Sequence, residues 1–315
     1  MLLEPRLVKL STRTGVEVRR TLPNAKLRRI GAWVFVDHFG PTEQTDGMVV
    51  AAHPHTGLQT MTWLFAGKVE HRDSVGSVQV IEPGQVNLMT AGRGISHSEL
   101  SQRGPISMHA AQLWIALPEN ARKITPSFQH IDVLPQLRFA DARHATGSLL
   151  VGKLMGQRSP AVVHTPLVAA ELNLPTGSVL TLPVDASFEH GVLVVGGEAL
   201  VNGERVGVTN LEFVAAGQGE LRLESIGPEP LQLLLIGGEP FNEPIVMWWN
   251  FIARTHEEIV AMREAWNSYE LADANGRFGA LSDGSGATLF STFADEVGGW
   301  IPAPELPNVV LRARL

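Results

Sequence analysis

The chain has 315 residues, of which 44% are hydrophobic and 18% are charged, and this balance excludes an intrinsically disordered protein. The formal net charge is −7 and no basic tract stands out, so a nucleic-acid partner is not expected from charge. The absence of cysteine excludes disulfides, thiolate zinc sites and a cysteine nucleophile.

The first residues of the chain, MLLEPR, lack the apolar core of a secretory signal. The longest dense apolar run, Leu233–Ile236, is far too short to span a bilayer. We therefore expect a cytoplasmic protein with no membrane partner.

Short runs rich in β-branched and aromatic residues fill most of residues 5–240. Turn-forming residues separate them, as at Pro83-Gly84 and Asn202-Gly203. Representative runs lie at residues 32–36, 60–65, 77–81 and 191–195. Many short strands at regular spacing predict a β-sandwich or a β-barrel.

Two short pairs of side chains carry the chemistry: His53 with His55, and His97 with Glu99. Alternate residues of a strand face the same side, so on neighbouring strands all four would project into one small volume. A lone His-x-His is more often two partly exposed residues. The second pair, which follows a Gly92-Arg93-Gly94 turn and ends in a carboxylate, favours a metal site.

The proposed ligands contain nitrogen and oxygen but no sulfur. Such a set suits Fe(II), Mn(II), Co(II), Ni(II) or Cu(II). Zinc would form a closed tetrahedral site with four protein ligands. An octahedral metal would instead keep two positions open for water, O2 or a substrate oxygen.

An internal repeat is visible in the sequence. Residues 87–94 (NLMTAGRG) resemble residues 210–219 (NLEFVAAGQG), and residues 64–68 (LFAGK) resemble residues 194–198 (VVGGE). Two copies of one β unit are therefore expected.

The alignment of the two copies places the three histidines of the proposed site over residues that form no recognisable metal site: Pro183, Asp185 and Arg222. We place the boundary between the copies within residues 125–160. The prediction is an N-terminal metal-binding domain, 1–140, and a C-terminal domain, 141–315, that lacks the ligands and ends in a helix and a tail.

A helix is predicted near the end of the chain. Residues 255–258 (THEE) have the Ser/Thr-x-x-Glu form of a capping box. Ile259, Met262 and Trp266 follow at helical spacing, and residues 301–307 contain three prolines, as in an extended tail.

Five motifs together closely resemble the pirin family of bicupins, over nearly the whole chain. They are residues 36–41 (VDHFGP), 53–60 (HPHTGLQT), 90–99 (TAGRGISHSE), 112–114 (QLW) and 242–247 (NEPIVM). The resemblance implies an all-β bicupin fold: two consecutive cupin barrels, of the double-stranded β-helix or jelly-roll type, with the short C-terminal helix added.

The resemblance also implies one mononuclear divalent transition metal, in the N-terminal barrel. Its ligands would be His53, His55, His97 and Glu99. Iron(II) is the first assignment, because iron is usual in pirins; Ni, Co, Cu, Mn and Zn are the alternatives. Many pirins have Arg and Glu where this chain has Thr56 and Gln59, so a differently charged pocket entrance is one expectation.

Some pirins are flavonol (quercetin) 2,3-dioxygenases, and animal pirins are nuclear transcription cofactors. The expected function is therefore a dioxygenase that uses O2 on a quercetin-like flavonol, with Glu99 as the base for the 3-hydroxyl proton. The alternative is a metal- or redox-sensing regulatory protein that acts through a protein partner.

Further residues are candidates for the substrate pocket. Gln112 and Trp114 share one strand face and could line the barrel, although core packing explains Trp114 equally well. Asp37 is a third candidate, and a turn after a strand is its alternative explanation. The remaining scattered histidines are expected to be surface or satisfied core residues: His71, His109, His130, His144, His164 and His190.

Overall fold

The computed structural model describes residues 1–10, 17–44, 47–101, 106–140, 142, 144–268, 278 and 300–315. The chain divides into two compact units whose segments interleave along the sequence. We call them the first barrel (Lys9–Val18, Phe39–His130 and Asn242–Leu315) and the second barrel (Met1–Val8, Arg19–His38 and Ile131–Phe241). Residues 1–140 and 141–315 as separate domains stay a prediction.

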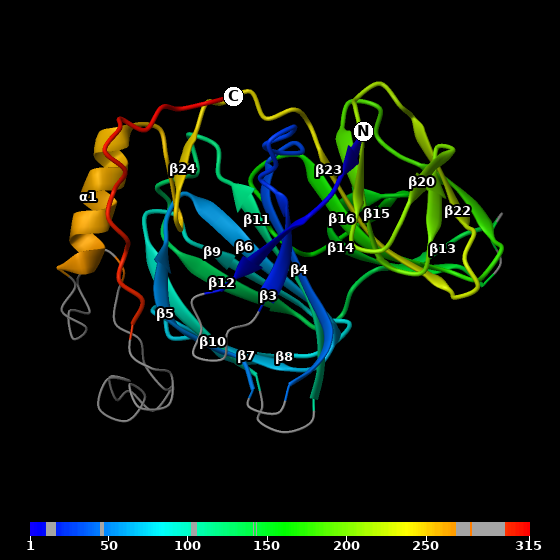
Figure 1. The fold of residues 1–315 in the computed structure, drawn as a ribbon, viewed down its shortest axis with the longest axis horizontal. Coiled ribbons are helices and arrows are strands. Elements are labelled where there is room, and N and C mark those ends of the chain that lie inside the picture. The colour runs from blue at the N-terminus through cyan, green and yellow to red at the C-terminus, as the bar shows by residue number, and fades with distance from the viewer. Residues whose placement is uncertain are drawn as a thin grey trace. The chain divides into compact units, whose positions relative to one another are not determined.

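The first barrel contains two antiparallel sheets (Figure 1). The larger sheet has the strand order β12 (Ser127–Ile131), β9 (Val86–Thr90), β6 (Leu58–Ala66), β11 (Ile106–Ala116) and β4 (Trp33–Gln44). The smaller sheet has the order β5 (Val49–His55), β10 (Ile95–Ser101), β7 (Val69–Asp73) and β8 (Val78–Ile81). The smaller sheet carries both pairs of proposed metal ligands.

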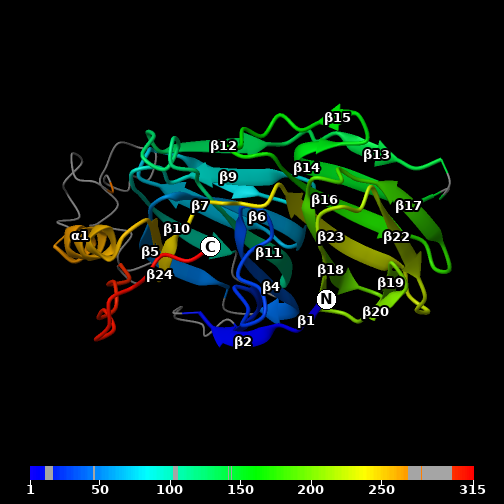
Figure 2. The ribbon, with the colours of Figure 1, turned by 90° about the horizontal axis from the view of Figure 1, so that it is seen from above.

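The second barrel has the same plan (Figure 2). Its larger sheet has the order β1 (Leu2–Leu3), β21 (Leu211–Val214), β18 (Glu189–Gly196), β23 (Leu231–Gly238), β16 (Leu167–Leu174), β14 (Thr146–Leu154) and β13 (Gln136–Arg138), with β15 (Gln157–Arg158) paired to β14. Its smaller sheet has the order β17 (Val179–Pro183), β22 (Glu220–Ser225), β19 (Ala199–Val201) and β20 (Glu204–Val206). The sheet that contains β4, described above, continues past β4 through β3 (Glu17–Leu22) to β2 (Arg6–Lys9).

The predicted internal repeat corresponds to this shared topology. The order β5-β10-β7-β8 recurs as β17-β22-β19-β20, and β9-β6-β11-β4 recurs as β21-β18-β23-β16. The two sequence echoes fall on matching strands: β6 with β18, and the β9–β10 region with the β21–β22 region.

The alignment of the copies was wrong by one residue. In each barrel a strand starts two residues after a glycine of the aligned motif: β7 at Val69, after Gly67, and β19 at Ala199, after Gly197. Val69 pairs with Ser101, and Ala199 pairs with Ser225. Counting back four residues from both serines places His97 over Leu221, and not over Arg222.

The same correction holds for the other two histidines. His53 is directly opposite His97, and Leu182 is directly opposite Leu221. His53 and His55 therefore correspond to Leu182 and Val184, in place of Pro183 and Asp185. Leu182, Leu221 and Leu223 belong to the buried core of the second barrel, whereas Arg222 faces outward and pairs with Glu224 at 2.9 Å. Apolar side chains thus occupy the positions that would hold a metal.

The predicted C-terminal helix is confirmed as α1 (His256–Asn267). The Thr255 side chain accepts a hydrogen bond from the backbone N–H of Glu258, as the capping motif requires. Ile259, Met262 and Trp266 are its buried residues. Among the described residues, no helix is long and apolar enough to cross a membrane.

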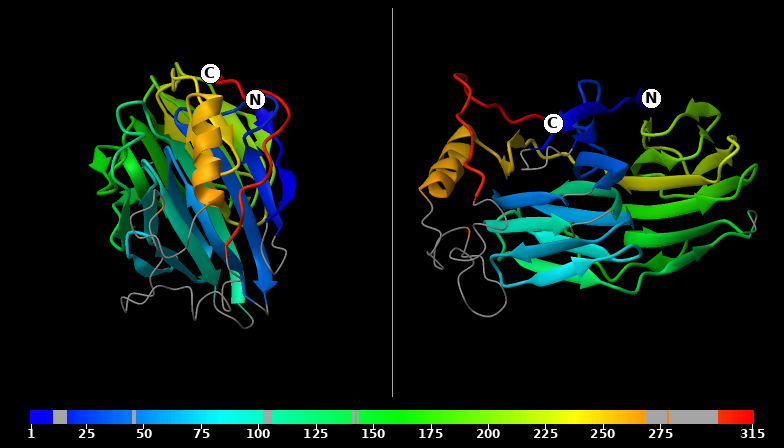
Figure 3. Two further views of the ribbon diagram at one scale, coloured as in Figure 1. Left: turned by 90° about the vertical axis from the view of Figure 1, so that its left-hand side faces the viewer. Right: turned by 60° about the horizontal axis from the view of Figure 1, so that its bottom comes forward.

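The C-terminal segments of the first barrel support strand β5. The hairpin of β24 (Val246–Trp248) and β25 (Phe251–Ala253) packs against α1, and residues 301–304 run beside the helix (Figure 3). Phe251 bridges to Thr56, directly after β5, and Trp300 bridges to Ala52 within it. The strand that carries His53 and His55 is therefore held from its outer edge by the end of the chain.

Candidate metal centre

Strand β5 places two histidines on one face. Its pairing with β10 puts His53 directly opposite His97 and His55 opposite Ile95. The register shifts between His97 and Glu99, because β5 holds one extra residue there. At this bulge, Nδ1–H of His53 donates to the backbone carbonyl of Ala51 at 2.8 Å. This hydrogen bond leaves Nε2 of His53 free.

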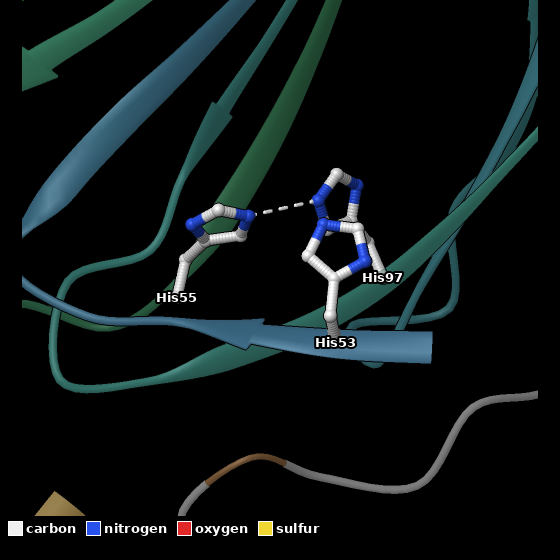
Figure 4. A group of neighbouring side chains, drawn as sticks. All are labelled: His53, His55 and His97. Atoms are coloured by element: carbon white, nitrogen blue, oxygen red, sulfur yellow. Dashed lines mark hydrogen bonds between the residues drawn. The ribbon is translucent and has the colours of Figure 1, made fainter. Parts of the chain in front are cut away.

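The three histidines meet inside the first barrel. Figure 4 shows His53 and His55 projecting from one strand and His97 reaching them from its neighbour. Nε2 of His55 lies 3.1 Å from Nε2 of His97, and the ring centroids of His53 and His97 are 4.3 Å apart. One nitrogen from each ring lies within 4.8 Å of one nitrogen of each of the others.

Burial keeps these three rings neutral. Desolvation lowers the pKa of His53 to about 4, although its hydrogen bond to Ala51 opposes the shift. Burial also lowers the pKa values of His55 and His97 well below the usual value, and the neighbouring histidines add to the effect. Neutral imidazole is the form that binds a metal, so no proton has to be displaced at neutral pH.

A fourth histidine lies directly behind the cluster. Nδ1 of His71, on β7, is 3.3 Å from Nδ1 of His97. Nε2–H of His71 donates to the Asp73 carboxylate at 3.0 Å, and both residues are buried. His71 is thus a satisfied core residue, one of the two expectations from the sequence, and it also lies against a proposed ligand. One pattern in the sequence could have indicated this position of His71. Asp73 lies two residues after it, which places a hydrogen-bond acceptor on the same face of the strand.

Glu99 occupies a distinct position at the cluster. A carboxylate oxygen of Glu99 lies within 4.8 Å of a ring nitrogen of His71 and of a ring nitrogen of His97. This group of neighbours includes neither His53 nor His55. Burial raises the pKa of Glu99, while His71 and a hydrogen bond with Thr62 oppose the rise. Metal ligation by Glu99 therefore stays a prediction.

The side chains present fit a transition metal. They supply three buried neutral imidazoles, with a carboxylate beside them. The 3.1 Å between the Nε2 atoms of His55 and His97 matches the separation of two adjacent ligands that are each about 2.1 Å from one ion. Two unprotonated nitrogens at this distance would repel each other, so a cation between them would relieve the conflict.

Family models match both halves of the chain: one described as Pirin at residues 15–115, and one described as the Pirin C-terminal cupin domain at residues 169–272. The chain belongs to the pirin family. These matches, with the observed sheets, confirm the predicted all-β bicupin fold with its C-terminal helix. A pirin fold with a buried histidine cluster indicates a metal centre.

Several individual proteins are similar to this pirin. A Pseudomonas aeruginosa protein whose name proposes a quercetin 2,3-dioxygenase is 43% identical, over 87% of this chain and 85% of that protein. The crystal structure of a quercetin 2,3-dioxygenase from Acinetobacter baumannii has a TM-score of 0.87 at 39% identity, covering 99% of this chain and 97% of the other. The bacterial pirin YhhW of Escherichia coli, in complex with nickel(II), shares the fold with a TM-score of 0.56 at 18% identity, over 76% and 99% of the two chains.

Two of the predicted pocket residues lie at the pirin site, and one lies elsewhere. Trp114 contacts the His55 ring edge to face, with 5.0 Å between the centroids. The Gln112 side chain accepts a hydrogen bond from Thr62 at 2.8 Å. Asp37 lies on β4, where both its carboxylate oxygens accept hydrogen bonds from Arg20, at 2.8 and 2.7 Å. The substrate roles of all three stay predictions.

The two departures from the common pirin sequence are buried structural positions. Thr56 donates to the sulfur of Met262, on helix α1, at 3.0 Å. Gln59 donates to the Thr90 hydroxyl at 2.9 Å. Both residues are fully buried. A differently charged pocket entrance stays a prediction.

No second metal cluster is found among the described residues of the second barrel. Its interior at the matching positions is apolar, as the corrected alignment shows. His190 is fully buried there, and burial lowers its pKa to about 4. A single buried imidazole does not make a metal site.

Proposed function

We propose that this pirin is a mononuclear metal-dependent dioxygenase that acts on flavonol-type substrates. The observation that carries the proposal is the convergence of His53, His55 and His97 as buried neutral imidazoles, with a carboxylate beside them. The similar quercetin 2,3-dioxygenase of Acinetobacter baumannii supports the substrate class.

The proposed ligands are His53, His55, His97 and Glu99, and the proposed ion is Fe(II). The Escherichia coli pirin that binds nickel(II) makes Ni the first alternative. When bound, the ion supplies Lewis acidity toward the hydroxyl and carbonyl oxygens of the substrate, together with the oxygen chemistry. The overall reaction consumes O2 and releases carbon monoxide from the flavonol ring.

Glu99 is the proposed general base for the 3-hydroxyl proton of the flavonol. Burial raises the pKa of this carboxyl group, and a higher pKa makes its carboxylate a stronger base. Its carboxylate lies beside the rings of His97 and His71.

Trp114 and Gln112 are proposed to face the substrate. They lie two residues apart on β11, on the face that also contacts His55 through Trp114. The indole offers an apolar surface for an aromatic ring, and the amide of Gln112 offers a hydrogen-bonding edge.

The test is O2 uptake with quercetin, with product analysis, by protein reconstituted separately with Fe(II), Co(II) and Ni(II). His55→Ala should lose stoichiometric metal and all metal-dependent uptake. Glu99→Gln should retain some metal, since an amide oxygen still ligates weakly, but should lose much of the rate because an amide cannot accept the proton.

The matched control is Glu70→Gln, which makes the same carboxylate-to-amide change at a half-buried position of β7 where the side chain pairs with Arg72. It should retain the wild-type rate. Equal rates for Glu99→Gln and wild type at equal metal content would eliminate Glu99 as the base. No metal-dependent O2 uptake by the wild type would contradict the dioxygenase function and favour the regulatory alternative.

A further inference from the structure

We propose that Asp73 and His71 are positioning residues that hold the ring proton of His97 on Nδ1 and so keep its Nε2 free for the metal. This inference rests on the proposed metal centre at His53, His55 and His97. His71 and Asp73 are both buried, and neither is among the proposed metal ligands.

The three side chains form a series of hydrogen bonds, from Asp73 through His71 to His97. The direction of each bond follows from Asp73, the acceptor at one end of this series. The Asp73 carboxylate can only accept, so Nε2–H of His71 donates to it, at 3.0 Å. The proposed series takes His71 as the neutral ring, whose lone pair is then on Nδ1. That atom lies 3.3 Å from Nδ1 of His97, which must therefore be the donor. The Nε2 lone pair of His97 points toward Nε2 of His55, at the proposed position of the metal.

The orientation of the Asp73 carboxylate is fixed by the backbone. Its Oδ1 accepts from the N–H groups of Val75 and Ser77, both at 3.0 Å, in the turn after β7. Only Oδ2 is left for His71. We call the hydrogen-bonded series Asp73–His71–His97 the relay. Because each oxygen of the Asp73 carboxylate has its own donors, the carboxylate connects the turn after β7 to this relay.

The His71 ring is held equally firmly. It stacks on Phe128, with centroids 4.5 Å apart and 15° between the planes. Antiparallel pairing of β7 with β10 sets Asp73 opposite His97 and His71 opposite Glu99. A ring with this little freedom can impose one proton position on its neighbour, as partners of metal-bound histidines do.

The arrangement predicts an unusual effect of Asp73→Asn. The two backbone N–H groups require an oxygen at Oδ1, so the new NH2 group must face His71. It would donate to Nε2 of His71, and this would move the His71 proton to Nδ1. His71 would then donate to Nδ1 of His97 and leave the His97 proton on Nε2, which blocks that nitrogen. The conservative change would thus reverse the whole relay.

Asp73→Ala has a different expected effect. It removes both acceptor oxygens, so the turn loses two hydrogen bonds and the protein becomes less stable. However, nothing then forces His71 into the wrong tautomer. Metal affinity and stability should therefore rank the two variants in opposite orders, whereas a purely structural function of Asp73 would rank them in the same order.

The experiment measures Co(II) dissociation constants by chelator competition, and melting temperatures of the metal-free protein. Asp73→Asn should bind Co(II) about 10–100-fold more weakly than wild type, with a smaller loss for Asp73→Ala. Asp73→Asn should nevertheless melt at a higher temperature than Asp73→Ala. The control Glu70→Gln, an amide substitution on β7 at a side chain that pairs with Arg72, should bind Co(II) like wild type.

A second measurement keeps the test decisive if Asp73→Asn folds poorly. Ring ¹⁵N NMR of the metal-free wild type should show His97 protonated on Nδ1, and His71→Phe, which can retain the stack on Phe128, should lose this preference and bind Co(II) more weakly. His97 protonated on Nε2 in the wild type, or wild-type affinity of both Asp73→Asn and His71→Phe, would overturn the relay. Failure of the wild type itself to bind Co(II) would instead contradict the metal centre, while the NMR result still tests the relay.

Discussion

Acidification should destabilise the metal-free protein, because its histidine cluster is neutral when folded. The pKa of His53 is lowered to about 4 in the folded chain, against the usual value of 6.5. Between these two values the unfolded state binds a proton that the folded state does not. Stability is therefore lost as pH falls from about 6.5 to about 4.

The magnitude follows from the shift. When unfolding takes up one proton, the free energy of unfolding falls by about 1.4 kcal/mol for each unit that the pH is lowered between the two pKa values. For His53 alone, the loss between pH 7.5 and pH 5.5 is about 1.3 kcal/mol, and it approaches about 3 kcal/mol at pH 4. The pKa values of His55 and His97 are shifted in the same direction, so the whole cluster should lose more than His53 alone.

The assay is urea unfolding of chelator-treated protein at pH 7.5, 6.5 and 5.5. The slope of the free energy of unfolding against pH gives the number of protons taken up on unfolding. For His53→Gln this number should be smaller than for wild type by about one. The control is His144→Asn, at an exposed histidine of positive φ, where asparagine is tolerated. Wild-type stability that does not fall between pH 6.5 and 5.5, or His53→Gln with the full wild-type slope, would refute the neutral buried cluster.

Three further predictions concern stability and are checked by urea unfolding. Leu221→Ala should lower the free energy of unfolding by about 2–5 kcal/mol, because Leu221 faces the core. Arg222→Ala should lower it by less than about 0.5 kcal/mol. Equal effects of the two substitutions would contradict the corrected alignment. Gly57→Ala should cost at least about 2 kcal/mol, since φ is +69° and a new Cβ would lie 2.2 Å from a backbone carbonyl; wild-type stability would mean that the turn relaxes freely. Arg122→Met should lower the free energy of unfolding by about 1–2 kcal/mol, because it removes the hydrogen bonds that Nη1 donates to both carboxylate oxygens of Glu258 on α1; no loss would show that this ion pair is screened.

The sequence was most informative where a short local pattern determines the structure. The His53-His55 pair could be placed on one face because the strand repeat is two residues, and pairing with β10 needed only the second motif. The helix after Thr255 was predictable because its cap and its apolar spacing are both local.

Long-range pairing limited the rest of the prediction. The assignment of Met1–Val8 to the unit formed by Ile131–Phe241 depends on β1 pairing with β21, more than 200 residues away, and no local pattern signals it. The one-residue error at Arg222 arose because a gapped sequence echo does not fix strand register, whereas alternating burial does. Had burial alternation been applied to residues 220–225, Leu221 and Leu223 would have been the inward positions.

His71 was missed for a related reason. A lone histidine gives no signal of its own, and its importance depends on the neighbouring strand β10, which brings His97 to 3.3 Å. The companion Asp73 was present in the sequence, but its two oxygens acquire separate functions only in the folded turn.

The most direct test of the metal centre is a crystal structure of the protein purified without chelator, with diffraction recorded above and below the absorption edge of the metal that elemental analysis identifies. We predict one anomalous peak per chain, within ligand distance of Nε2 of His53, His55 and His97, and none inside the second barrel. A peak bound elsewhere, or a metal-replete crystal with no peak at these three nitrogens, would contradict this prediction.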